Sequence, residues 1–142
     1  MRIEELKRID KSEMYKIYDK WPEIAKESYN EENKPMDVKD IDHIIFAGMG
    51  GSGTIGDVMK SILSKADIHV NVNKGYTLPN TVDKNTLIVI ISVSGNTQET
   101  ISILKQAFNS DAKIIAFSSG GKIEEFCKEK KIIFKKISIH HS

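Results

Sequence analysis

The spacing of hydrophobic residues changes along this chain at residue 43. Before that point apolar residues recur every three or four positions, as in Ile3, Leu6 and Ile9 and again over residues 14–21, which predicts helices. A polar connector follows at residues 30–40. After it, short apolar runs alternate with segments of helical spacing. The pattern predicts a helical segment at residues 1–35 that packs on a domain formed by residues 36–142.

The apolar runs of the second part are rich in β-branched residues and predict strands. Because strands and helices alternate, we expect an α/β fold: a three-layer sandwich in which helices cover both faces of a five-stranded parallel sheet. The run TLIVIIS is the most apolar and should lie in the middle, which favours the flavodoxin-like strand order 2-1-3-4-5. The predicted strands are residues 43–48, 68–73, 86–92, 112–118 and 132–137, and the predicted helices between them are residues 54–66, 97–108 and 122–131.

Three of the predicted strands end in loops of unusual composition. GMGGSG at residues 48–53 follows the first strand, SVSGNT at residues 92–97 follows the third, and SSGG at residues 118–121 follows the fourth. In a parallel sheet all three loops lie at one edge. Ligands bind at this edge, near the point where the strand order reverses, which here falls between the first and third strands.

The chemistry of these loops suits a small anion. Glycines let the backbone approach a ligand, and the amides that begin a helix attract negative charge. Ser92, Ser94 and Thr97 are spaced so that three hydroxyls could converge on one phosphate, and Asn96 with Glu99 resembles a capping box. We therefore expect a phosphorylated ligand whose body extends toward residues 50–52. The alternative is that these loops are only tight, well-capped turns.

The glycine spacing also fits G-x-G-x-x-G, the fingerprint of dinucleotide-binding proteins. Such a site needs an acidic residue at the end of the second strand, about 20 residues after the glycines, to hold the ribose. The second strand here ends in Asn71, Val72, Asn73 and Lys74, without a carboxylate. The sequence therefore disfavours a dinucleotide.

Composition and charge exclude several other classes of protein. The 142 residues carry a net charge of +1 with both signs interspersed, so we expect neither nucleic acid nor a membrane as partner. The charged N-terminus lacks the apolar core of a signal peptide, and no run is long enough for a membrane span. Cys127, the single cysteine, is expected to be a half-buried helical thiol in a reducing compartment, which predicts a cytoplasmic location.

The segments GMGGSGTIGD, SVSGNTQET and SSGGKI, in this order, resemble the SIS (sugar isomerase) domain. They are most similar to the N-terminal half of archaeal-type bifunctional phosphoglucose/phosphomannose isomerases. The resemblance implies reversible conversion of glucose 6-phosphate and mannose 6-phosphate to fructose 6-phosphate through an enediol, with neither a metal nor a cofactor. It also implies that the phosphate is bound by Ser92, Ser94 and Thr97 and that the sugar lies along Gly50, Gly51 and Ser52.

In the resembled family a second SIS domain supplies the glutamate base and the ring-opening histidine. A sugar-contacting arginine follows the fifth strand of the first domain. This sequence has no position that matches them, so the catalytic residues are unknown. Glu99 is interpreted as a cap, Asp57 as a first-turn partner of the helix dipole, and His43 and His69 as lying at the wrong edge of the sheet.

Three hypotheses about function stay open at this point. The chain is the binding domain of an isomerase, a non-catalytic sugar-phosphate sensor, or one subunit of a split isomerase. In each case we expect a homodimer or pairing with a second SIS domain, because a lone domain would leave apolar helix stripes uncovered.

Overall fold

The computed structural model describes residues 8–11, 13–30 and 38–138. The chain divides into two compact units, and Val38–Ile139 form the larger one. The smaller unit contains α2 (Met14–Asp19) and α3 (Trp21–Asn30), which confirms the helices predicted there. Residues 3 and 6 and the predicted boundary after residue 35 lie outside the described residues. The packing of residues 1–35 on the domain stays a prediction.

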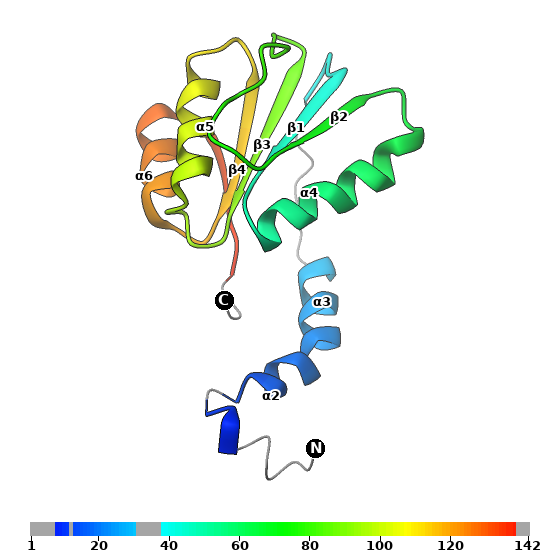
Figure 1. The fold of residues 1–142 in the computed structure, drawn as a ribbon, viewed down its shortest axis with the longest axis vertical. Helices are drawn as coiled ribbons and strands as arrows, with labels where there is room; N and C mark the ends of the chain where they lie inside the picture. Colours follow the sequence, from blue (N-terminus) through cyan, green and yellow to red (C-terminus); the bar gives the residue numbers. More distant parts are fainter. Residues whose placement is uncertain (1–7, 12, 31–37, 139–142) are drawn as a thin grey trace. The chain divides into compact units, whose positions relative to one another are not determined.

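The larger unit is built on a five-stranded sheet (Figure 1). All pairings are parallel, and the strand order is β2-β1-β3-β4-β5, so the predicted order 2-1-3-4-5 is confirmed. The register places Ala47 beside Ile90 and Ser92 beside Ser118, so these strands end at one edge. The strands are β1 (His43–Ala47), β2 (His69–Asn73), β3 (Thr86–Ser92), β4 (Lys113–Ser118) and β5 (Ile133–Lys136).

Helices cover both faces of the sheet, as β3 shows best. Ile88 and Ile90 belong to the apolar cluster completed by α5 (Gln98–Phe108) and α6 (Gly121–Lys130). Val89 and Ile91 alternate with them and belong to the opposite cluster, against which Met59 of α4 (Gly51–Ile62) packs. The short 3₁₀ helix η1 (Leu63–Lys65) continues α4. The continuous apolar run of β3 is therefore buried from two sides, and the three-layer prediction is confirmed (Figure 1).

The core of the described residues contains two buried titratable groups, Cys127 and His43. The Cys127 side chain is 0% exposed, so the expectation of a half-buried thiol was wrong, and burial raises the pKa of this thiol to about 11. At the amino end of the strands, His43 is 6% exposed, and its Nδ1 lies 3.3 Å from Thr86 Oγ1. Burial and the neighbouring His69 lower the pKa of His43. Both histidines lie at the edge opposite the three loops, as predicted.

Candidate functional site

The three polar loops meet at the carboxyl edge of the sheet. The loop after β1 lies against β3, since a Cβ atom built on Gly48 would be 2.8 Å from the Ile91 carbonyl oxygen. The loops after β3 and β4 are hydrogen-bonded to each other. The Ser119 amide donates to the Val93 carbonyl oxygen at 3.2 Å, and the Ser119 hydroxyl donates to the same oxygen. The predicted grouping of the loops is confirmed.

Asn96 joins the loop after β3 to the start of α6. Its Nδ2 donates to the Ser94 carbonyl oxygen at 3.1 Å, and its Oδ1 accepts a hydrogen bond from the Lys122 amide at 3.2 Å. The predicted capping box with Glu99 was therefore wrong. Helix α5 has Thr97 as its N-cap residue, and no side-chain hydrogen bond caps it. The Asn96 side chain stabilises the contact between two loops instead of ending a helix.

Two glycines with positive φ let these loops approach closely. Gly95 has φ of 68° and Gly121 has φ of 69°. A Cβ atom on Gly95 would overlap the Gly120 carbonyl, and one on Gly121 would lie 2.7 Å from the Ser94 carbonyl oxygen. Such distances do not occur between real atoms, so both positions require glycine for folding alone.

Two of the three predicted hydroxyls come together. Ser92 Oγ lies 3.1 Å from Thr97 Oγ1 and accepts a hydrogen bond from the Gly95 amide at 3.1 Å. Ser92 is 3% exposed, whereas Thr97 is half-buried and Ser94 is exposed. The Ser94 hydroxyl accepts a hydrogen bond from the Asn96 amide at 3.3 Å. The accessible hydroxyls of this loop are therefore those of Thr97 and Ser94, and Ser92 holds Thr97 from within.

The loop after β1 differs from the other two, because no atoms pack against part of its backbone. The amides of Ser52 and Gly53 donate to the Met49 carbonyl oxygen at 3.1 and 3.4 Å, which fixes the turn. Gly50 has φ of 55° and ψ of −129°, a conformation that favours glycine. Gly51 has no positive φ, and a Cβ atom built on it would meet no heavy atom within 4 Å. Folding alone therefore does not require glycine at position 51.

The helix that begins after β3 presents an uncapped amino end. Among the described residues, the N-cap residues of α4, α5 and α6 make no capping side-chain hydrogen bond. The first turn of α4 nevertheless bonds to the Met49 carbonyl oxygen, and that of α6 bonds to Asn96 Oδ1 and the Gly95 carbonyl oxygen. The first N–H groups of a helix have no partner within the helix, and they carry the positive end of its dipole. The edge therefore offers backbone donors and positive potential to an anion.

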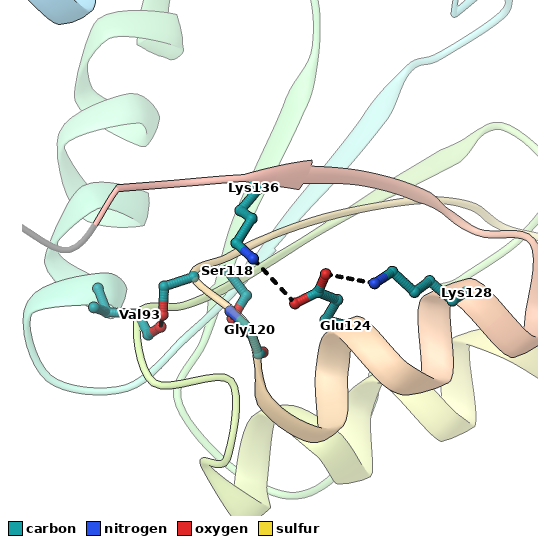
Figure 2. A network of polar contacts seen from close by, with 7 residues as sticks. Val93, Ser118, Gly120, Glu124, Lys128 and Lys136 are labelled. Atoms are coloured by element: carbon teal, nitrogen blue, oxygen red, sulfur yellow. Dashed lines mark hydrogen bonds and ion pairs between the residues drawn. The ribbon is translucent and has the colours of Figure 1, made fainter.

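Several charged side chains beside the loops form ion pairs. Glu124 of α6 lies 2.7 Å from Lys128 Nζ and 3.7 Å from Lys136 Nζ, at the end of β5 (Figure 2). The hydrogen bond from Lys128 is the main reason why the pKa of Glu124 is lowered. Lys74 reaches over Gly53 to form a 2.6 Å ion pair with Asp57. Asp57 lies in the middle of α4, so its predicted role in the first turn was wrong.

The connection from β2 to β3 adds a residue that the sequence interpretation missed. The Glu99 carboxylate raises the pKa of the Tyr76 phenol through a side-chain hydrogen bond, so Glu99 does not act as the predicted cap. Tyr76 follows the end of β2 by three residues, and segments that follow a parallel strand share its carboxyl edge. The position of Tyr76 shortly after β2 is the sequence signal that could have identified it as a site residue. The strand itself ends in Asn73, whose Oδ1 accepts a hydrogen bond from the Gly75 amide at 3.0 Å, so no carboxylate stands where a ribose would need one.

Comparison with known proteins identifies the family. The model of the SIS domain matches residues 38–139. This chain belongs to the SIS domain family. A bifunctional phosphoglucose/phosphomannose isomerase of Caldicellulosiruptor bescii is 41% identical over 112 residues, which cover 76% of this chain and 33% of that protein. A D-glucosamine-6-phosphate 4-epimerase of Sulfolobus acidocaldarius is 33% identical over 118 residues, covering 82% of this chain and 37% of that protein.

A solved structure is similar as well. It is that of a hypothetical protein from Methanococcus jannaschii, from which a molecular function of 3-hexulose-6-phosphate isomerase was inferred. The TM-score is 0.59 at 26% identity, and the match covers 72% of this chain and 56% of that one. The SIS domain described here spans about a third of the length of the curated relatives it matches. None of the helices in the described ranges has the length and hydropathy that crossing a membrane requires.

Proposed function

We propose that the chain binds a hexose 6-phosphate at the carboxyl edge of its sheet and is the phosphate-binding domain of a phosphoglucose/phosphomannose isomerase. The observation that carries the proposal is the open backbone at Gly51, the first residue of α4. Gly95 and Gly121 are explained by close contacts, but Gly51 is not. A ligand that lies against the bare backbone explains it.

The phosphate is proposed to lie at the start of α5. Thr97 and Ser94 would donate hydroxyl hydrogen bonds, and the uncapped amides of the first turn would add backbone donors. Ser92 would act by holding Thr97, with which it shares a 3.1 Å hydrogen bond. The sugar would then extend along Gly50, Gly51 and Ser52, which follow the neighbouring strand β1.

The proposal assigns no catalytic base within the described residues. Isomerisation through an enediol needs a carboxylate or another base that is free to take a proton. Glu124 is held between two lysines, and Glu99 interacts with Tyr76. We therefore propose that a second SIS domain supplies the base. Because phosphate esters are charged and do not cross bilayers, the same proposal places the protein in the cytoplasm.

The second SIS domain is proposed to cover the outer face of α4. Ile55, Val58 and Ile62 occupy positions i, i+3 and i+7 of this helix, and they are 49%, 52% and 66% exposed. The inner face packs tightly, since a Cβ atom on Gly56 would lie 2.8 Å from Phe46 Cβ. In a solution of this chain alone the occupant is a second copy. Val58→Glu should lower the sedimenting mass from dimer to monomer, and an unchanged dimer would reject this surface.

Calorimetry with fructose 6-phosphate tests the site. Ser94→Ala combined with Thr97→Ala should weaken binding by about 2–4 kcal/mol, because hydroxyl hydrogen bonds to a charged group are lost. Ser61→Ala, an exposed serine of α4 away from the loops, is the control and should leave affinity unchanged. Equal affinities in wild type and double variant would contradict the proposed phosphate site.

Turnover assays separate the three hypotheses about activity. Conversion of glucose 6-phosphate or mannose 6-phosphate by the chain alone would show a complete isomerase. Conversion only after a second SIS chain is added would show a split enzyme. Binding without turnover in both experiments would favour a sugar-phosphate sensor and reject the isomerase.

A further inference from the structure

We propose that Tyr76, together with Glu99, recognises the sugar hydroxyls of the bound ligand and thereby distinguishes a sugar phosphate from phosphate alone. This inference rests on the proposed function, because it places a specificity-determining residue beside the proposed phosphate site. Three features support it: the anchoring of the Tyr76 backbone on α5, the place of Glu99 on the same face of that helix, and the acceptor chemistry of the pair.

The Tyr76 backbone is anchored on α5. Its carbonyl oxygen accepts hydrogen bonds from Ser102 Oγ at 2.9 Å and from Gln106 Nε2 at 2.6 Å. The other side of the Gln106 amide is also used, since Oε1 accepts a hydrogen bond from the Leu78 amide at 3.0 Å. Asn73 Nδ2 adds a 2.7 Å hydrogen bond to the Thr77 carbonyl oxygen. The segment around Tyr76 is therefore fixed along one stripe of α5.

That stripe leads to the proposed phosphate site. Glu99, Ser102 and Gln106 stand at positions i, i+3 and i+7, so they share one face of the helix. The Tyr76 backbone lies beside the last two, and its phenol meets Glu99 at the first. Glu99 follows Thr97, the N-cap residue, by two positions. The Tyr76 side chain is therefore within reach of Glu99, one turn before Ser102 and near the start of α5, where the phosphate is proposed to bind.

The pair offers hydrogen-bond acceptors to whatever is attached to the phosphate. A tyrosine phenol carries its proton at neutral pH and can donate it to the Glu99 carboxylate, and this hydrogen bond raises the pKa of Tyr76. The phenol oxygen and the second carboxylate oxygen are then available as acceptors. Tyr76 is 56% exposed, which leaves its ring open to a ligand. Hydroxyl groups of a sugar can donate to these acceptors, whereas the Glu99 charge repels a phosphate dianion.

The test compares two probes, fructose 6-phosphate and inorganic phosphate, by NMR titration of the full chain. Tyr76→Phe should weaken fructose 6-phosphate about five- to tenfold and change phosphate affinity less than twofold, because one hydrogen bond to the sugar is lost. Glu99→Gln should also reduce the preference for the sugar phosphate, while binding phosphate about twofold more tightly, because a nearby like charge is removed. Tyr29→Phe, at an 88% exposed tyrosine of α3, is the matched control and should change neither affinity.

The outcomes distinguish this inference from the proposed function. If wild type binds both probes and both variants keep the wild-type preference, the role of Tyr76 and Glu99 is rejected and the phosphate site stands. If Tyr76→Phe weakens both probes equally, Tyr76 supports the loop structure and does not recognise the sugar. If wild type binds neither probe, the proposed function and this inference are both rejected. A loss confined to fructose 6-phosphate supports the inference.

Discussion

Three glycine-to-alanine substitutions separate folding from binding at this edge. Gly95→Ala forces a side chain into a positive φ of 68°, which costs about 1–2 kcal/mol. The added Cβ would also lie 2.7 Å from both Ser118 Oγ and the carbonyl carbon of Gly120, and such overpacking costs about 1–3 kcal/mol. The sum, about 2–5 kcal/mol, is a large part of the roughly 5–15 kcal/mol that stabilises a domain. For a domain of this size the midpoint of thermal unfolding should fall by about 10–30 °C.

The two other variants test one effect each: Gly50→Ala tests backbone strain, and Gly51→Ala tests the proposed contact with the ligand. Gly50→Ala has open space around the new Cβ but keeps the positive φ of 55°, so it should lose only the backbone contribution of about 1–3 kcal/mol. Gly51→Ala has neither problem and should be as stable as wild type or more stable by about 0.4–1 kcal/mol. It should nevertheless bind fructose 6-phosphate at least about tenfold more weakly. Calorimetric unfolding and ligand titration measure both quantities. A Gly95→Ala protein as stable as wild type would refute the packing argument, and full affinity in Gly51→Ala would refute the proposed ligand contact.

The remaining predictions concern buried groups. Thr100 Oγ1 is a buried oxygen without a hydrogen-bond partner among the described residues, so Thr100→Val should raise the free energy of unfolding by about 1 kcal/mol in urea titration, and a loss of stability would reveal a partner. The lowered pKa of His43 means that the unfolded chain binds the proton more tightly. Stability should therefore be complete above pH 6.5 and fall as the pH drops from 6.5 through the lower folded pKa, and a rise over that range would contradict the prediction. His69, Asp83 and Asp42 are the charged or titratable neighbours that act on His43. Cys127, fully buried and with a pKa of about 11, should react with a thiol reagent at pH 8 only after denaturant is added, and rapid labelling of the native protein would refute its burial.

The sheet was predictable because each of its signals is local. β3 (Thr86–Ser92) matches the predicted run, since seven consecutive residues dominated by aliphatic side chains are found in a strand covered on both faces. The start of α4 was placed three residues too late, at residue 54 instead of Gly51. The reason is that the glycines that begin this helix carry no hydrophobic period. Helical spacing becomes visible only from Ile55 onward.

The candidate site was predictable in its location but not in its internal bonding. Loop composition and strand order together indicated the edge, because both follow from sequence. The partners of Asn96 and Glu99 did not follow from it. Local spacing suggested a capping box, whereas Asn96 bonds to Lys122, 26 residues away, and Glu99 meets Tyr76 across the sheet connection. Polar side chains choose among several partners of similar energy, so tertiary contacts decide.

The arrangement of the loops also explains how binding and turnover could be divided between domains. The β3 and β4 loops are held together through Asn96 and through glycines that accept no side chain, so the proposed phosphate donors are positioned before any ligand arrives. Donors fixed in advance need little reordering on binding, which favours affinity without a partner. A base for the chemistry is not positioned in the same way, since the carboxylates described at this edge already interact with other side chains. Removing a second SIS domain should therefore abolish turnover while leaving much of the phosphate affinity, whereas Ser94→Ala with Thr97→Ala should reduce both. A chain that binds fructose 6-phosphate only in the presence of its partner would contradict this division.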